Sequence, residues 1–214
     1  MMKYRDIDSL NEAMKKQYSK YAEDIIRNMK FDNSPKVQNI QEKIKQLAEK
    51  LELTDKGLRT LKTTLLPMLI PAGVKASSRG VRFNSYINML LTKEISKRWS
   101  NKVSITFETP YHGVNEIPDW TITFKDSNKR IIGYNQLDLW SGGAQINRGA
   151  KYILDDHFHS RIRSHNIFIV CIVLRKYKAK SENKTTQIIR KGLEEQRLFW
   201  PKGFVHYLQK FLDD

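Results

Sequence analysis

Three oxygen-bearing side chains occur at a spacing that could place them around one metal ion. Asp119 opens a segment in which apolar and polar residues alternate, and Gln136 and Asp138 lie two residues apart on the next such segment. Because strand side chains two residues apart point to the same side, a hairpin of these segments would bring the three groups together. Carboxylate and amide oxygens are ligands that Mg²⁺ prefers, so the pattern favours a divalent-metal site.

The two segments are predicted to form antiparallel strands joined by a short turn. Apolar residues alternate with threonines over residues 120–124, which is typical of a half-buried strand. Residues 126–129 carry short polar side chains that favour a turn. A second strand is expected over residues 130–139, and it would carry Gln136 and Asp138 on one face.

Cations follow the second strand closely. Gly142 and Gly143 would end the strand, and Arg148 and Lys151 lie a few residues beyond them. Carboxylates that hold a metal ion, with cations nearby, suit reactions at a phosphate group.

The composition points to a polyanionic partner. The chain of 214 residues has 38 lysines and arginines against 23 aspartates and glutamates, which gives a formal net charge of +15. A folded surface with this positive field attracts nucleic acid, because neutralised phosphates release their condensed counterions. The alternative is a basic protein from an organism whose proteins are rich in lysine.

Cysteine content and hydropathy limit the kinds of site and the cellular compartment that the chain can be expected to have. The single cysteine, Cys171, lies in an apolar run, and its solitude excludes an intrachain disulfide and a cysteine-rich zinc site. No apolar stretch approaches the ~20 residues that span a bilayer, and the N-terminus is polar where a signal peptide would be apolar. We therefore expect a cytoplasmic protein without a membrane partner.

The chain is expected to divide into a helical arm over residues 1–75 and a core domain over residues 76–214. In the arm, Ser34 and Pro35 could cap and begin one amphipathic helix, and Thr54 could cap a second. The arm could dimerise the protein or bind DNA as a helix-turn-helix. The lack of a clear recognition-helix pattern favours dimerisation.

The core domain is expected to mix helices and strands. Around the hairpin, the periodicity predicts a loop at 76–80, a helix over 83–99, a strand over 103–107, a helix over 145–164 and a strand over 167–173. The last strand is apolar on both faces, which is typical of a covered strand that a right-handed crossover places parallel to its neighbour. Two amphipathic segments close the chain on either side of Pro201.

This order of elements over roughly residues 80–175 resembles the core of the PD-(D/E)XK nuclease superfamily, and most of all a type II restriction endonuclease. Pro118-Asp119 matches the family's Pro-Asp, and residues 136–138 fall where the family has an acid-x-lysine pair. The sequence departs from that pattern, since Gln136 replaces the acid and Asp138 replaces the lysine. The resemblance implies an α/β fold with a restriction-endonuclease-like core, in which helices flank a central mixed sheet, plus the N-terminal helical arm.

The resemblance also implies catalytic roles. Asp119 and Asp138 would be inner ligands of Mg²⁺, and Gln136 would offer a carbonyl oxygen or orient a metal-bound water. Lys151, or Arg148, would take the place of the missing lysine.

Outer roles follow in the same way. Glu94, on the helix before the first strand, would be a further metal ligand, with Glu108 and Glu116 as alternatives. Side chains that flank the site would read the edges of DNA bases. These candidate DNA-binding residues are Arg79, Arg82, Gln145, Asn147 and Arg148.

Each central residue also has a purely structural interpretation. Asp119 could cap a turn, Gln136 could be a buried amide satisfied by the backbone, and Asp138 could form an ion pair with Arg148 or Lys151. These alternatives remain open at the level of the sequence.

Together the patterns predict a Mg²⁺-dependent endonuclease that cuts double-stranded DNA at a short palindromic site as a homodimer. A structure-selective repair or recombination nuclease would use the same core and would cut branched DNA regardless of sequence. A DNA- or RNA-binding protein without catalysis would keep the basic surface and bind with a steep salt dependence and no metal requirement.

Overall fold

The computed structural model describes residues 4–29, 35–111, 114, 116–163 and 166–213. The chain divides into two compact units, one formed by residues 1–26 and 83–214 and the other by Arg27–Arg82. The sequence placed the boundary near residue 75 and assigned the first 26 residues to the arm.

In chain order the described elements are α1 (Ile7–Gln17), α2 (Lys20–Asn28), α3 (Pro35–Lys50), α4 (Asp55–Leu69), α5 (Ala72–Arg98), β1 (Val103–Phe107), β2 (Trp120–Phe124), β3 (Arg130–Gln136), α6 (Gly143–Gly149), the π-helix η1 (Ala150–Leu154), α7 (Asp156–Arg163), β4 (Ile167–Val173), α8 (Lys184–Glu194), β5 (Leu198–Phe199) and α9 (Pro201–Asp213).

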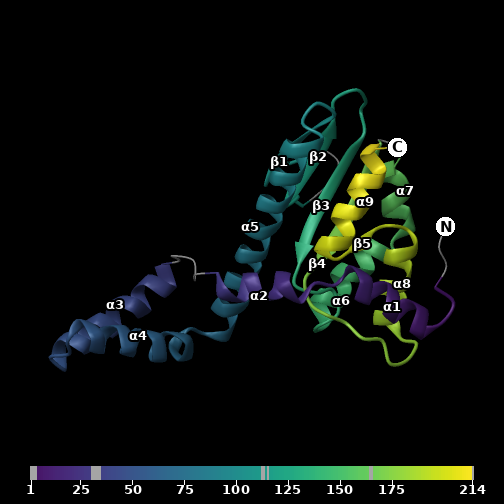
Figure 1. The fold of residues 1–214 in the computed structure, drawn as a ribbon. Helices are drawn as coiled ribbons and strands as arrows, with labels where there is room; N and C mark the ends of the chain where they lie inside the picture. The colour runs from purple at the N-terminus through teal and green to yellow at the C-terminus, as the bar shows by residue number, and fades with distance from the viewer. Residues whose placement is uncertain (1–3, 30–34, 112–113, 115, 164–165, 214) are drawn as a thin grey trace. The chain divides into compact units, whose positions relative to one another are not determined.

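The unit of residues 27–82 is built on the helix pair α3 and α4, which pack against each other (Figure 1). Helix α3 begins at Pro35, as predicted, while Ser34 lies outside the described residues. Thr54 caps α4 as predicted, because its side chain accepts a hydrogen bond from the backbone N–H of Gly57 at 3.3 Å. Val37 and Ile44 of α3 are buried.

The larger unit contains a five-stranded sheet in the order β1-β2-β3-β4-β5. Strands β1, β2 and β3 are antiparallel neighbours, whereas β3, β4 and β5 run parallel to one another. The predicted mixed α/β class, the hairpin and the parallel covered strand are therefore confirmed. The β2–β3 register pairs Trp120 with Gly133, which brings the start of β2 beside the end of β3.

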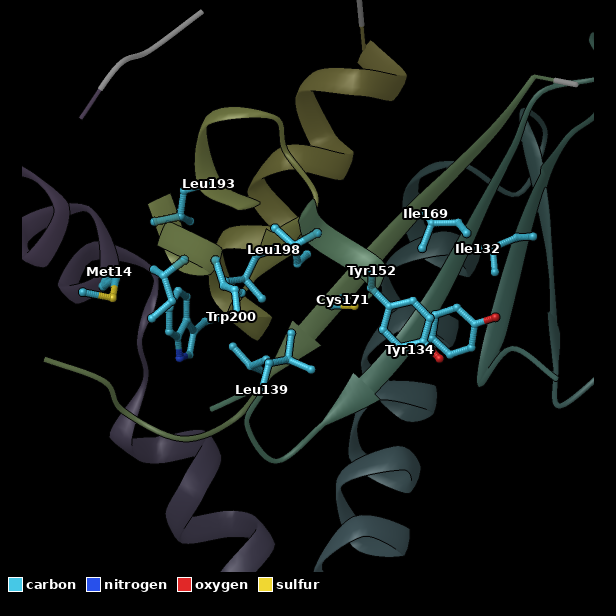
Figure 2. Close-up of a cluster of buried hydrophobic side chains, with 14 of the residues drawn as sticks. Met14, Ile132, Tyr134, Leu139, Tyr152, Ile169, Cys171, Leu193, Leu198 and Trp200 are labelled. Atoms are coloured by element: carbon cyan, nitrogen blue, oxygen red, sulfur yellow. The ribbon is translucent and has the colours of Figure 1, made fainter. Parts of the chain in front are cut away.

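Helices cover both faces of the sheet (Figure 1). On one face, α9 packs its Phe204 ring against Trp120 of β2, with the centroids 5.1 Å apart. On the other face, side chains of β3 and β4 join η1, α7, α8 and α1 in one buried cluster. Figure 2 shows this cluster, in which Tyr134 of β3 stacks on Tyr152 of η1 with ring centroids 4.7 Å apart.

Four predicted boundaries were wrong. Helix α5 runs unbroken through residues 76–80, where a loop was expected. Strand β3 ends at Gln136 rather than at residue 139, because the chain then enters a turn. The helix expected over residues 145–164 is split into α6, η1 and α7, and the segment before Pro201 contains the short strand β5.

Gly133 of β3 leaves room for the indole of Trp120. A Cβ added at Gly133 would lie 1.8 Å from Cζ2 of Trp120. The indole is fully buried, and its Nε1 donates to Oδ1 of Asn135 at 3.1 Å, so it has little freedom to move away. We expect Gly133→Ala to destabilise the fold by about 3 kcal/mol, at the upper end of overpacking costs.

Urea unfolding followed by circular dichroism would measure this loss. Gly80→Ala is the matched control, because a Cβ added there meets nothing within 4 Å and alanine favours a helix. Equal stabilities of the two variants would contradict the packing of Trp120 on Gly133.

A histidine is buried on the opposite face of the sheet. His159 of α7 is 3% exposed, and its Nε2 bonds to the carbonyl oxygen of Tyr152. Burial first, and the charges of Arg197 and Arg163 second, lower the pKa of His159 to about 4. In the unfolded chain His159 is therefore protonated near pH 6.5, whereas in the folded protein it is protonated only at a much lower pH.

We expect the fold to lose stability as the pH falls from about 6.5 towards 4, by roughly 3 kcal/mol from this residue. Urea titrations at several pH values measure the slope. His159→Gln should flatten it, because the glutamine amide can also donate to Tyr152 but does not titrate. His157→Gln, at an exposed position of the same helix, is the control variant, and equal slopes in the two variants would contradict a specific role of the buried His159.

Across the part of the chain that the structure describes, no helix combines the length and the apolar character needed to cross a membrane.

Candidate functional site

Asp119 immediately precedes β2, and its two carboxylate oxygens are held by β3 and by α5. Its Oδ2 accepts the backbone N–H of Asn135 at 2.6 Å, and its Oδ1 accepts Nδ2 of Asn84 at 2.8 Å. Its own backbone N–H donates to the carbonyl oxygen of Gly133 at 3.1 Å, which extends the β2–β3 ladder by one residue. The carboxylate is thus fixed at the end of β3 rather than free in a loop.

The surroundings of Asp119 raise the pKa of its carboxyl group above the ordinary value. Burial raises the pKa of its carboxyl group, and the nearby negative charge of Glu108 acts in the same direction. The two hydrogen bonds and the positive charge of Arg148 oppose this rise without cancelling it. A charged group kept where burial penalises it is a frequent mark of a functional site.

Gln136 lies on the same face of the sheet as Asp119. The β2–β3 register places Asp119 on the side of Tyr134, and Gln136 follows two residues later on that side. Its Oε1 accepts a hydrogen bond from Nη1 of Arg148 in α6 at 3.2 Å. The hairpin places Asp119 and Gln136 on one side, as the sequence predicted, and α6 adds Arg148 to this neighbourhood.

Lys151 reaches the same neighbourhood from η1. Its Nζ lies 2.8 Å from Oε1 of Glu116, which precedes Asp119 by three residues. The hydroxyl of Tyr134 donates to the carbonyl oxygen of Glu116 at 3.2 Å, so Glu116 is anchored to β3 as well. A π-helix inside a helical segment is rare and often occurs at functional sites, and this one carries Lys151. We call Asp119, Gln136, Glu116, Arg148 and Lys151 the β3-end site.

Asp138 has a different set of partners. Its Oδ1 accepts the backbone N–H groups of Trp140 and Ser141 at 3.2 and 2.8 Å. Its Oδ2 accepts the Ser141 hydroxyl and Nη1 of Arg175, both at 2.7 Å. The side chain is 2% exposed, so these four bonds use a buried carboxylate to close the turn after β3. The ion pair expected with Arg148 or Lys151 is formed instead with Arg175.

Glu94 lies away from Asp119 on the same helix that supplies Asn84. It forms an ion pair with Arg98 at 3.2 Å, one turn further along α5. Ten residues of α-helix separate it from Asn84, a distance of about 15 Å along the axis. The two alternatives to Glu94 lie nearer to Asp119. Glu108 donates its backbone N–H to the Asp119 carbonyl oxygen at 3.2 Å, and Glu116 precedes Asp119 by three residues.

The predicted DNA-reading residues fall into two groups. Arg79 and Arg82 belong to the unit of residues 27–82, where the buried Arg82 bonds to the Ser78 hydroxyl and to the carbonyl oxygen of Arg27. The others lie on α6, directly after the turn that Asp138 closes. Asn147 and Arg148 are exposed there, and Gln145 is half-buried.

Three residues that hold the site were not predicted. Asn84 and Asn135 bind the Asp119 carboxylate, and Arg175 binds Asp138. Asn84 adjoins the apolar stripe of α5 as a polar residue next to the fully buried Phe83, which was an available signal. Asn135 interrupts the apolar alternation of β3 in the same way.

Within the described residues, no group of three or more His, Cys, Asp or Glu side chains is arranged to hold a metal ion.

Comparison with models of protein families finds no match, and the same is true of comparisons with curated proteins and with solved structures.

Proposed function

We propose that the protein is a Mg²⁺-dependent endonuclease that hydrolyses phosphodiester bonds of double-stranded DNA. The observation that carries the proposal is Asp119, a carboxylate held in two fixed hydrogen bonds at a position where burial raises its pKa. The protein buries this carboxyl group although burial disfavours its charged form, and it places the cation of Arg148 nearby. Such a cost is understandable where the carboxylate has a chemical task.

The oxygen donors of the β3-end site suit a magnesium ion. Each oxygen of Asp119 accepts one hydrogen bond, and a carboxylate has about four acceptor positions, so it retains capacity for a cation. Mg²⁺ is usually bound through one or two carboxylates together with waters and substrate phosphates, which asks little of the protein. Asp119 and the amide oxygen of Gln136 would hold the ion. When bound, it would make a water more acidic and neutralise charge on the phosphate.

Asp138 is omitted from this ligand set. Its buried carboxylate already accepts four hydrogen bonds, one of them from Arg175. We assign it the role of holding the turn that carries α6, and thereby Arg148, to the end of β3. The acid-x-lysine pattern would then be replaced by residues from other segments.

The remaining residues of the site would act on the phosphate. Arg148 is exposed and lies close enough to lower the pKa of Asp119, so its guanidinium could position a non-bridging phosphate oxygen. Lys151 is 43% exposed and paired with Glu116, and exchange of that partner for a phosphate would bring a cation to the leaving oxygen.

The substrate and assembly follow from charge and symmetry. The net charge of +15 suits a polyanion, and Asn147 and Arg148 on α6 could reach base edges next to the site. Cutting both strands of a palindrome is easiest with two identical sites on a two-fold axis, so we propose a homodimeric restriction endonuclease.

Incubation with plasmid and phage DNA, with Mg²⁺ or with a chelator, tests the proposal. Discrete fragments that appear only with Mg²⁺ are expected, and their ends would give the recognised sequence. Cleavage confined to branched DNA would replace site-specific restriction by a structure-selective activity. DNA that is shifted on a gel but remains intact under all metal conditions would overturn the catalytic proposal.

A further inference from the structure

A pocket of about 290 Å³ lies between α1 and the segment that follows β4. Asn11 of α1 fixes this segment, because its Nδ2 donates to the carbonyl oxygen of Ala179 at 3.1 Å and its Oδ1 accepts the Ala179 N–H at 2.9 Å. The two walls are therefore clamped together next to the opening. The volume is at the small end of the range for ligand sites, and it suits a single base with its sugar rather than a larger molecule.

Aromatic rings line the pocket. Trp200 is buried and immobilised, because its Nε1 donates to the carbonyl oxygen of Arg175 at 3.0 Å. Tyr177 is half-buried, and its ring lies 5.0 Å from that of Trp140, which in turn lies 6.4 Å from Trp200. Tyr18, which directly follows α1, also lines the pocket. Trp200 is 1% exposed and forms the closed wall of the pocket, whereas the half-buried rings of Tyr177 and Tyr18 can offer a face on which a nucleobase stacks.

Lysine side chains also line the pocket. Lys176 and Lys178 flank Tyr177 in the chain, and both are exposed. Nζ of Lys176 lies 5.8 Å from the centre of the Tyr18 ring, while Lys15 is paired with Glu12 at 3.3 Å. Aromatic rings and exposed ammonium groups in one pocket match the two parts of a nucleotide, whose base is flat and apolar on its faces and whose phosphate is an anion.

The pocket is joined to the β3-end site by the turn after β3. Arg175 begins the lysine-bearing segment and binds Asp138, and Trp140 lies two residues beyond Asp138 in the same turn. Trp140 also packs on Tyr177, so a DNA strand that leaves the β3-end site could follow this turn to the pocket.

We propose that this pocket binds one unpaired nucleotide, with the base stacked among Tyr177 and its neighbouring rings and the phosphate between Lys176 and Lys178. The inference shares with the proposed nuclease only its nucleic-acid partner, and it requires neither a metal ion nor catalysis. It adds a site for a single-stranded or extruded base to a protein whose remaining surface meets the duplex.

Binding of single-stranded pentathymidylate to the full-length protein in the presence of a chelator tests the proposal. The reference ligand is an abasic chain with the same number of phosphates. Fluorescence anisotropy should show the abasic chain bound about tenfold more weakly, because its charge is the same and its bases are missing. Equal affinities would overturn the proposal, since charge alone would then explain binding.

A cross-link and two tyrosine variants locate the contact. Pentathymidylate with one 5-bromodeoxyuridine should form a photo-cross-link within residues 176–178, and Tyr177→Ala should weaken binding by about tenfold. Tyr21→Ala, which removes a tyrosine that is 73% exposed on α2, should have no effect. Cross-links outside the pocket, or equal effects of the two variants, would contradict the site. Failure of plasmid cleavage alone would remove the nuclease proposal and leave this one intact.

A charge-matched pair completes the test. Lys176→Gln together with Lys178→Gln should reduce pentathymidylate affinity more than Lys93→Gln together with Lys97→Gln, two exposed lysines of α5. Equal losses would indicate a diffuse electrostatic surface and would count against a phosphate position at the rim of the pocket.

Discussion

Asp119→Asn is expected to slow Mg²⁺-dependent DNA cleavage by at least about a thousandfold, or roughly 4 kcal/mol in the barrier, while the protein stays folded. The substitution removes the negative charge that would attract the metal ion and changes little else. The Asn135 N–H can still donate to the new amide oxygen. Asn84 can rotate its own amide and accept from the new NH₂ group, so both hydrogen bonds at this position survive.

The same variant should be at least as stable as the wild type at neutral pH. Because burial raises the pKa of Asp119, the folded protein binds that proton more tightly than the unfolded chain does. The charged form therefore costs stability, and the Asp119 carboxyl group should contribute a gain in stability as the pH falls through its raised pKa towards the pKa of the unfolded chain, opposite in sign to the loss expected from His159. The asparagine variant should lack this gain.

Cleavage rates and urea unfolding of the same preparations separate the two effects. Asp126→Asn is the matched control, since it makes the same change at an exposed position in the β2–β3 turn. Retained cleavage in Asp119→Asn would remove Asp119 from the reaction. Lost cleavage together with lost stability would indicate a structural role.

Asp138→Ala should have the opposite profile, with a loss of about 3 kcal/mol in the free energy of unfolding. The change deprives two buried backbone N–H groups and the Ser141 hydroxyl of their acceptor. It also breaks the ion pair with Arg175, in which the carboxylate is buried. Arg175 itself is 45% exposed and can be solvated after the loss, which keeps the cost below that of a fully buried pair.

Asp138→Asn distinguishes the turn from a metal site. Asparagine keeps an oxygen for the N–H groups of Trp140 and Ser141 and loses only the charge, so most of the stability should return. Chemical denaturation at pH 7 measures the series, and cleavage of plasmid DNA under folding conditions should recover with it. If the asparagine variant were stable and inactive, Asp138 would be a metal ligand after all.

Strand period was sufficient to predict the part of the site that depends on local geometry. Asp119 and Gln136 were expected on one side of a hairpin, and the alternation of β2 and β3 places them there. The position of Asp138 could not be obtained in this way, because a strand ends where its hydrogen-bonding partners end. Its partner Arg175 is 37 residues away in the chain and lies beyond a parallel crossover.

A residue that binds Asp119 but lies far from it in the sequence could not be predicted from the sequence pattern either. Asn84 is 35 residues from Asp119, and the α5 periodicity indicates only that this position borders the buried face. The helix predicted over residues 145–164 is divided at η1, whose Tyr152 stacks on Tyr134 in a tertiary contact that the local pattern does not contain. Propensity and period predicted the class of the fold, and packing decided where its elements stop.

The mixed directions of the strands around β3 imply an order of assembly. The bond between Asp119 and Asn135 closes a loop of 16 residues within one hairpin, whereas the bond between Asp138 and Arg175 closes one of 37 residues through a crossover. The longer closure costs roughly 0.7 kcal/mol more in chain entropy, and parallel pairing is intrinsically slow. During folding, the Asp119 carboxylate would thus be positioned first, and the turn that brings Arg148 to it would be secured only when β4 docks.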